Sequence, residues 1–396
     1  MVNRMRFGIF LGPHHAPVEQ NPTLAYSRDL ATIQLLDELG YDEAWVGEHH
    51  SCGSEIVPDP AMFIAWAASQ TRHIKLGTGV VSLPYHNPLW VADRMIMLDH
   101  LTRGRMMMGI GPGALPTDAM MIGLDMATQR QAYAQDADVL MHLLLNDEPI
   151  SIETPRYTLR DARCQLRPYS DPCFEVAAAA VISPAGPRVA GKHGMSMLSV
   201  GATMRGTDGF DVLGQHWHEL EKQSAAHGFT ADRAGWRVVG PMHVAETREQ
   251  AAKDVEYGID PFFDYLQRTA ATPQFQVQGD NVRERIEWVR ESGIGVIGTP
   301  DDAIEHIQTL VDQADGFGCF LMLAQEWSNW EAVKRHYELF ARYVMPHFQN
   351  STVRQKKNET WARQQMRELW EKQNSAIQGY IANPDGTPAV SAGSTS

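Results

Sequence analysis

The chain has 396 residues, of which 43% are hydrophobic and 21% charged, a composition typical of a globular protein and not of a disordered one. Its formal net charge of −14 argues against nucleic acid or an anionic membrane as a partner, because the field of the protein repels polyanions. The 4 cysteines show no CxxC spacing, which disfavours a disulfide framework or a zinc knuckle and favours reduced thiols.

Short apolar runs rich in strand-forming residues alternate along the chain with segments of helical periodicity. In the first such unit, Asn21 is a predicted helix cap, Pro22 the first helical residue and Gly40 the stop signal. The alternation predicts an α/β fold, a (β/α)₈ TIM barrel, with a doubly wound open sheet as the alternative. The predicted strands are residues 6–11, 43–47, 75–81, 106–110, 174–180, 196–200, 237–244 and 319–324.

The length exceeds the roughly 250 residues of a plain barrel, so we expect insertions after strands six and seven. Segment 258–292 is polar and turn-rich, which is typical either of a lid or of a surface loop without a role. We expect the barrel to span 1–350. The remainder, 351–396, is predicted to be a helix over about 353–379 with a flexible tail. This helix docks either on a neighbouring subunit or on its own barrel.

The N-terminus shows no signal-peptide pattern, and no apolar run approaches the ~20 residues that span a bilayer. These features predict a cytoplasmic protein without a membrane partner.

In a barrel of this kind the loops after the carboxyl ends of the strands build the active site. Histidine pairs follow two of these strands, at His14 and His15 and at His49 and His50. Adjacent side chains diverge in an extended segment, unlike the HxH spacing of barrel metal sites. We therefore predict no metal site, and a metal hydrolase is the weaker hypothesis.

Glycines and prolines mark three further strand ends. Ser183 is a predicted cap of a helix in which Gly186 lets an anion approach free backbone N–H groups, although an ordinary capped helix fits as well. Glycines 77 and 79 indicate a bulge, an unusual peptide, a close ligand or room for a neighbouring side chain. "GIGPGA" lacks the GxGxxG spacing and predicts a turn.

Several segments in this order resemble the bacterial luciferase-like flavin monooxygenases over residues 5–349. They are "GYDEAWVGEHH", "LGTGVVSLPYHNPLWVADRMIMLDHLTRGR", "GIGPGALPTDAMMIGLDMATQR", "SPAGPRVAGKHG" and "GTPDDAIEHIQ". The motifs "EHHS" and "GVVSLPYHNPL" are similar to those of the limonene 1,2-monooxygenase-like branch of this family.

The resemblance implies a barrel that binds reduced FMN and forms a flavin peroxide with O2, which oxygenates a hydrophobic small molecule such as a terpene, cyclic ketone or aldehyde. It also implies a separate flavin reductase and a homodimer. The substrate and the type of oxygenation stay open. The alternatives are a deazaflavin-dependent dehydrogenase on the same barrel and a non-catalytic flavoprotein subunit.

The resemblance also assigns site residues. His49 matches the catalytic histidine and Glu48 the acid beside the flavin, whereas strand alternation predicts that His50 points away. Gly111 and Pro112 replace a cysteine and an arginine of luciferase, which argues against light emission. The expected cofactor-binding residues are Gly79 and Val80 at a cis peptide beneath the ring, Gly111, and, at the phosphate, Arg130, Tyr133, Ser183 and Gly186.

Overall fold

The computed structural model describes residues 4–15, 20–200, 212–268 and 278–383. The chain divides into two compact units, Met1–Gln349 and Asn350–Ser396.

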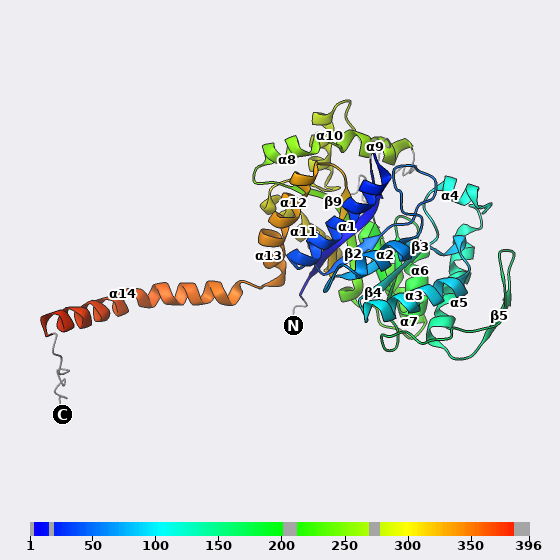
Figure 1. Ribbon diagram of the computed structural model, residues 1–396, viewed down its shortest axis with the longest axis horizontal. Coiled ribbons are helices and arrows are strands. Elements are labelled where there is room, and N and C mark those ends of the chain that lie inside the picture. Colours follow the sequence, from blue (N-terminus) through cyan, green and yellow to red (C-terminus); the bar gives the residue numbers. More distant parts are fainter. Residues whose placement is uncertain (1–3, 16–19, 201–211, 269–277, 384–396) are drawn as a thin grey trace. The chain divides into compact units, whose positions relative to one another are not determined.

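The first unit is a closed parallel barrel (Figure 1). The ring runs β1-β2-β3-β4-β7-β8-β9-β11 and closes by the pairing of β11 with β1. All eight predicted strands are confirmed, and ring closure excludes the open sheet. The strands are β1 Arg6–His14, β2 Glu43–Val46, β3 Lys75–Ser82, β4 Met106–Gly111, β7 Glu175–Ala180, β8 Ser196–Val200, β9 Trp236–Val244 and β11 Cys319–Gln325.

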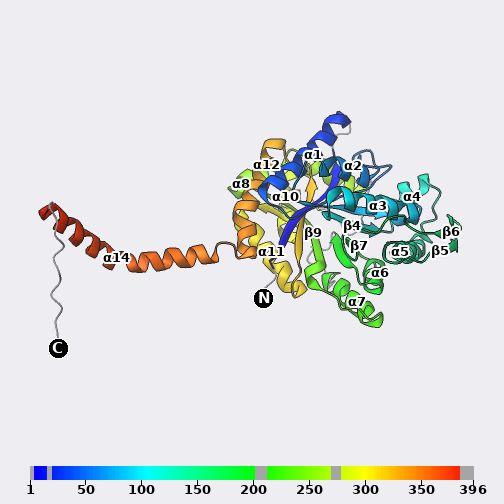
Figure 2. The same ribbon diagram turned by 60° about the horizontal axis from the view of Figure 1, so that its bottom comes forward.

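Helices surround the ring of strands (Figures 1 and 2). The first helix has the predicted ends, because the Asn21 side chain accepts a hydrogen bond from the Thr23 amide and Gly40 adopts a left-handed φ of 80°. The surrounding helices are α1 Pro22–Leu39, α2 Pro60–Ala68, α3 Pro88–Thr102, α5 Gln129–Leu145, α6 Ala185–His193, α7 Val212–Ala226, α11 Pro300–Ala314 and α12 Trp330–Leu339.

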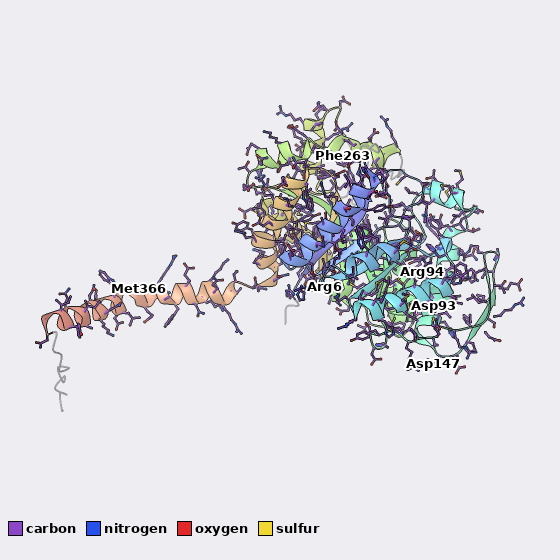
Figure 3. All side chains as sticks on the ribbon, viewed as in Figure 1. Arg6, Asp93, Arg94, Asp147, Phe263 and Met366 are labelled. Carbon is purple, nitrogen blue, oxygen red and sulfur yellow. The ribbon has the colours of Figure 1, made fainter. Side chains whose placement is uncertain are left out.

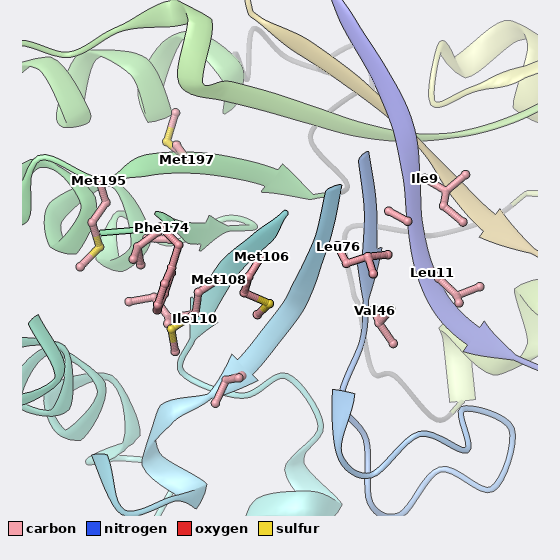
Figure 4. Close-up of a cluster of buried hydrophobic side chains, with 14 of the residues drawn as sticks. Ile9, Leu11, Val46, Leu76, Met106, Met108, Ile110, Phe174, Met195 and Met197 are labelled. Atoms are coloured by element: carbon pink, nitrogen blue, oxygen red, sulfur yellow. The ribbon is translucent and has the colours of Figure 1, made fainter. Parts of the chain in front are cut away.

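Strand alternation separates two apolar layers. On β4, Met106, Met108 and Ile110 belong to the large cluster between strands and helices (Figure 4). Met107 faces the other way and packs with Trp45 in the barrel interior.

The amino end of the barrel interior holds a buried ion cluster. Arg237 is fully buried and binds Glu43 and Glu175, with 2.7 Å from Nε to Oε2 of Glu43 and 2.7 Å from Nη1 to Oε1 of Glu175. Glu43 and Glu175 are the first residues of their strands, so this cluster fills the end of the barrel opposite the carboxyl edge.

The predicted insertion after the seventh strand is confirmed. It holds α8 Arg248–Val255, α9 Ile259–Arg268, α10 Val282–Ser292 and the short strand β10 Val296–Gly298. The described parts of segment 258–292 are mostly helical, so a turn-rich excursion is the wrong description of them. Phe263, labelled in Figure 3, packs with Trp327 in a separate apolar cluster. Residues 269–277 lie outside the described ranges.

An insertion between the fourth and fifth strands was not predicted. It comprises α4 Pro116–Met121 and the hairpin of β5 Ile150–Glu153 and β6 Thr158–Ala162. After the sixth strand, residues 201–211 lie outside the described ranges, and α7 follows them. The predicted insertion at that place therefore falls largely on residues that are not described.

The barrel unit ends with a π-helical turn, Phe340–Val344, and α13 Met345–Gln349. The second unit contains α14 Val353–Ala382, which confirms the predicted C-terminal helix. Large apolar side chains on α14 are exposed, Met366 among them (Figure 3). Within the described ranges, no helix combines the length and apolar composition that crossing a membrane requires.

Candidate active site

Glu48 lies where the loops after β2 and β3 meet at the carboxyl edge of the barrel. Its Oε1 accepts hydrogen bonds from Nε2 of His50 at 3.0 Å and Nε2 of His86 at 2.7 Å. Its Oε2 accepts the Ser82 amide at 2.9 Å. The expectation that His50 points away is wrong, because β2 ends at Val46 and strand alternation does not extend to residue 50.

These contacts set the charge of Glu48. Burial raises the pKa of its carboxyl group, but the hydrogen bonds from His50, His86 and Ser82 outweigh burial and lower that pKa to about 2. Glu48 is therefore ionised at neutral pH.

His49 lies between two other carboxylates. Its Nδ1 is 3.2 Å from Oδ2 of Asp118, on α4, and its Nε2 makes a close ion-pair contact of 2.8 Å with Oε2 of Glu55, in the loop after β2. Asp118 is 1% exposed and also accepts the His50 amide at 3.0 Å and the Ser51 hydroxyl at 2.5 Å. Each ring nitrogen of the predicted catalytic histidine thus faces an acid.

The two carboxylates determine the protonation of His49. Burial lowers its pKa, but Glu55 and Asp118 more than compensate and raise the pKa well above 6.5. The imidazole is therefore a cation at neutral pH with both nitrogens occupied. Such a ring acts as a fixed positive charge and not as a free acid that titrates near neutrality.

The loop after β2 is shaped by contacts to the end of β1. Glu55 forms an antiparallel bridge with His14, and the His15 amide donates to the Ser54 carbonyl at 2.7 Å. His15 itself binds Asp29 of α1 at 3.0 Å. His14 is 4% exposed, and neither of its ring nitrogens has a hydrogen-bond partner within the described residues. The described His, Cys, Asp and Glu side chains form no group of three or more suited to a metal.

The peptide between Gly79 and Val80 is cis, as the resemblance implies, and it lies where the register of β3 against β4 shifts. A Cβ on Gly111 would lie 2.8 Å from Cγ2 of Val80, so the small residue on β4 makes room for the valine. Gly79, Val80 and Gly111 are thus neighbours on two adjacent strands.

Arg130 and Tyr133 lie in the first turns of α5. Arg130 is exposed. Tyr133 is fully buried, and its hydroxyl has no partner among the described residues. Burial alone raises the pKa of this hydroxyl above its usual value. Gln129 ties this helix start to the turn after β4, because its Nε2 donates to the Pro112 carbonyl at 2.5 Å. The start of α5 is therefore fixed beside Gly111.

The prediction that Ser183 caps α6 is wrong. The cap residue is Pro184, and within the described ranges the helix has no side-chain cap hydrogen bond. Gly186 has a steric reason to be glycine, because a Cβ there would lie 2.0 Å from the Ala179 carbonyl oxygen at the end of β7. The uncapped amides at the start of α6 nevertheless remain a suitable anion site, and α6 packs against α5.

Comparisons with known proteins identify the family. Residues 5–315 match the family model described as luciferase-like monooxygenase. The chain belongs to the luciferase-like monooxygenases. It is 45% identical over 345 residues to limonene 1,2-monooxygenase of Rhodococcus erythropolis, covering 87% of each chain. It is 39% identical to 4-hydroxyprotoasukamycin monooxygenase of Streptomyces nodosus subsp. asukaensis, covering 92% of this chain and 98% of the relative.

A solved structure shares the fold. The oxygenating constituent of 3,6-diketocamphane monooxygenase of Pseudomonas putida, a type II Baeyer-Villiger monooxygenase in complex with FMN, superposes with a TM-score of 0.71. Its sequence is 22% identical, with 87% of this chain and 98% of the other covered. The family membership, the barrel and the monooxygenase class predicted from the sequence are thus confirmed.

Sequence reasoning missed three side chains of this luciferase-like site. His86, Glu55 and Asp118 bind the predicted residues directly. His86 and Asp118 stand in the motifs "SLPYHNP" and "LPTDA", directly after strand ends, where they could have been singled out. Glu55 offers no comparable signal.

Proposed function

We propose that this protein is the oxygenating component of a two-component, FMN-dependent monooxygenase. It takes reduced FMN from a separate reductase and transfers one atom of O2 to a hydrophobic small molecule such as a terpene, a cyclic ketone or an aldehyde. The observation that carries the proposal is the imidazolium of His49, held between Glu55 and Asp118 beside the ionised Glu48. The family match and the relatives named above support it.

The described residues fit a phosphate-bearing cofactor. A buried tyrosine hydroxyl without a partner indicates an absent ligand or water, and Tyr133 supplies such a group in α5. The uncapped amides at the start of the neighbouring α6 favour an anion, and the exposed Arg130 supplies a cation nearby in α5. These groups would hold the FMN phosphate, while Gly79, Val80 and Gly111 would lie along the ring.

Bound reduced FMN supplies the reaction with O2. The protein residues supply charge and position. His49 provides a fixed positive charge that stabilises negative charge developing on oxygen, and its low exposure strengthens the effect. Glu48 holds the side chains of His50 and His86 in one orientation and keeps the start of the turn after β3 in place through Ser82.

The proposal also includes a cytoplasmic location and assembly as a homodimer. A reduced flavin that passes between two proteins requires a compartment where the reductase and its nicotinamide are present. The absence of disulfides among the four cysteines, all of which are described, supports a reducing compartment.

The test is oxygenation with labelled dioxygen. We expect the protein, reduced FMN and 18O2 to place one labelled atom in a product from a panel of terpenes, cyclic ketones and aldehydes. A parallel binding measurement compares FMN with the deazaflavin cofactor F420. No label in any product, or preference for F420 with hydride transfer, would contradict the proposal and favour a deazaflavin-dependent dehydrogenase.

A further inference from the structure

Tyr265 reaches the candidate site from the insertion after the seventh strand. It lies in α9, is 8% exposed, and its ring packs on His14 with a centroid distance of 4.9 Å. His14 in turn forms a backbone bridge with Glu55, and the Tyr265 hydroxyl lies close enough to interact with the side chains of Glu55 and Cys52. A side chain of the insertion therefore packs against the acid that pairs with His49.

The helix that carries Tyr265 is fixed to the barrel near its start. The Gly258 amide donates to the Trp327 carbonyl at 3.0 Å, and a Cβ on Gly258 would lie 1.9 Å from the Glu326 carbonyl oxygen. Phe262 packs on Trp327 at 5.8 Å between ring centroids and on His14 at 5.4 Å. The position of Tyr265 over the end of β1 is therefore built into the apolar packing of the insertion.

Glu55 has little freedom to move. Its side chain is 11% exposed, and its Oε1 lies so close to β1 that a Cβ on Gly12 would be 2.8 Å away. Its amide donates to Cys52 Sγ at 3.1 Å, which closes the turn that carries it. Tyr265 completes this set of contacts from the side of the insertion.

We propose that Tyr265 is a positioning residue, which holds Glu55 and through it fixes the His49 imidazolium against Asp118. The catalytic consequence of this inference rests on the proposed function. The contacts of Tyr265 themselves do not depend on a cofactor. Tyr265 never needs to touch the substrate or the flavin in this role. Its loss should change the titration and the orientation of His49 while the barrel remains folded.

Four titratable groups act directly on His49. They are Glu55 and Cys52 in its own loop, Asp118 on α4 and the neighbouring His50. His14 at the end of β1 and Tyr265 on α9 act on Glu55 instead. The variants must therefore be compared by the titration of His49 itself and not by activity alone.

The experiment is an NMR titration of the His49 ring in the flavin-free full chain. Glu55→Gln should lower the pKa of His49 by at least about one unit, because one neighbouring charge is lost. Tyr265→Phe should lower it by a smaller amount and broaden the His49 signals, because Glu55 gains freedom. Tyr257→Phe is the matched control, since this tyrosine precedes α9 and is 55% exposed.

Activity gives the second readout. In Tyr265→Phe we expect more hydrogen peroxide released per product at an unchanged affinity for FMN, with Tyr257→Phe equal to wild type. A His49 titration in Tyr265→Phe identical to that of wild type, with Glu55→Gln shifted as expected, would overturn the proposal. If the titrations shift but the wild type oxygenates no substrate, the positioning role stands and the proposed function fails. Should Tyr265→Phe not fold, Glu55→Asp, which keeps the charge but shortens the side chain, must reproduce the loss of orientation.

Discussion

Nε2 of His86 lies 2.7 Å from Oε1 of Glu48, so a histidine from the turn after β3 binds an acid near the start of the loop after β2. His50 binds the same oxygen at 3.0 Å. Glu48 thereby joins the loops that follow two neighbouring parallel strands, β2 and β3. Its role in stability can be separated from its role beside a flavin, because stability can be measured without the cofactor.

Replacing Glu48 by glutamine should destabilise the protein at neutral pH. The fall of the carboxyl pKa from 4.5 to about 2 corresponds to roughly 3 kcal/mol of stabilisation. A lowered pKa stabilises the fold above the unfolded-state value, and this contribution is lost as the pH falls from about 4.5 toward 2. Urea unfolding of wild type and Glu48→Gln should therefore differ most at pH 7, differ by about half as much at pH 3, and converge only near pH 2.

The control for this variant is Glu153→Gln, at an exposed position of β5. We expect it to unfold as the wild type does at each of these pH values. A difference between wild type and Glu48→Gln that is as large at pH 3 as at pH 7 would show that the carboxylate charge is not responsible.

Replacing His49 by alanine should slow oxygenation by about 10² to 10³-fold, because one preorganised charge is lost, while FMN still binds, since no predicted phosphate or ring contact is removed. Because the pKa of His49 is raised well above 6.5, its charge is present below and through neutral pH and is lost only at higher pH. The wild-type rate should therefore show no ionisation of His49 near pH 6.5. Single-turnover rates and an FMN titration of His49→Ala test this.

The matched control is His73→Ala, at an exposed histidine before β3, on the opposite edge of the barrel. Its rate and its stability should equal those of the wild type. Full activity of His49→Ala would remove His49 from its proposed role.

The barrel could be predicted because its signals are local. Each strand is a short apolar run, and the ends of α1 follow from Asn21, Pro22 and Gly40. The hairpin of β5 and β6 lacks a comparable apolar run, because its strands are only 4 and 5 residues long and bury few side chains. The start of α6 was placed at Ser183 from capping preference, but the helix begins after Pro184 and leaves its first amides without a side-chain cap.

The site was predictable in part. His49 and Glu48 are recognisable from their motif at a strand end, whereas the charge of His49 depends on Asp118, which is 69 residues away in the chain. Glu55 is closer in sequence, but its contact depends on the fold of the loop against β1. The residue types at the site can thus be read from the sequence, and their protonation cannot, because it depends on tertiary contacts.

Gly186 tests whether the start of α6 is shaped by packing or by a ligand. In Gly186→Ala the added Cβ would lie 2.0 Å from the Ala179 carbonyl oxygen, so we expect the free energy of unfolding to fall by about 1–3 kcal/mol without FMN present. Gly379→Ala is the control, because no atom lies within 4 Å of its Cβ and α14 should gain about 1 kcal/mol in helix propensity. Equal stability of Gly186→Ala and wild type would show that the backbone of α6 yields easily.

Tyr133 separates stability from cofactor binding. Its hydroxyl is buried and has no partner among the residues that the structure describes, so Tyr133→Phe removes no hydrogen bond found there and should keep or raise the stability of the cofactor-free protein, by up to about 1 kcal/mol. If the hydroxyl binds the FMN phosphate, the affinity for FMN should fall about tenfold, whereas that for riboflavin, which lacks the phosphate, should not change. Tyr157→Phe should do the opposite, because its hydroxyl donates to Asp136 at 2.8 Å: stability falls and FMN affinity stays. Equal losses of FMN and riboflavin affinity in Tyr133→Phe would place the hydroxyl away from the phosphate.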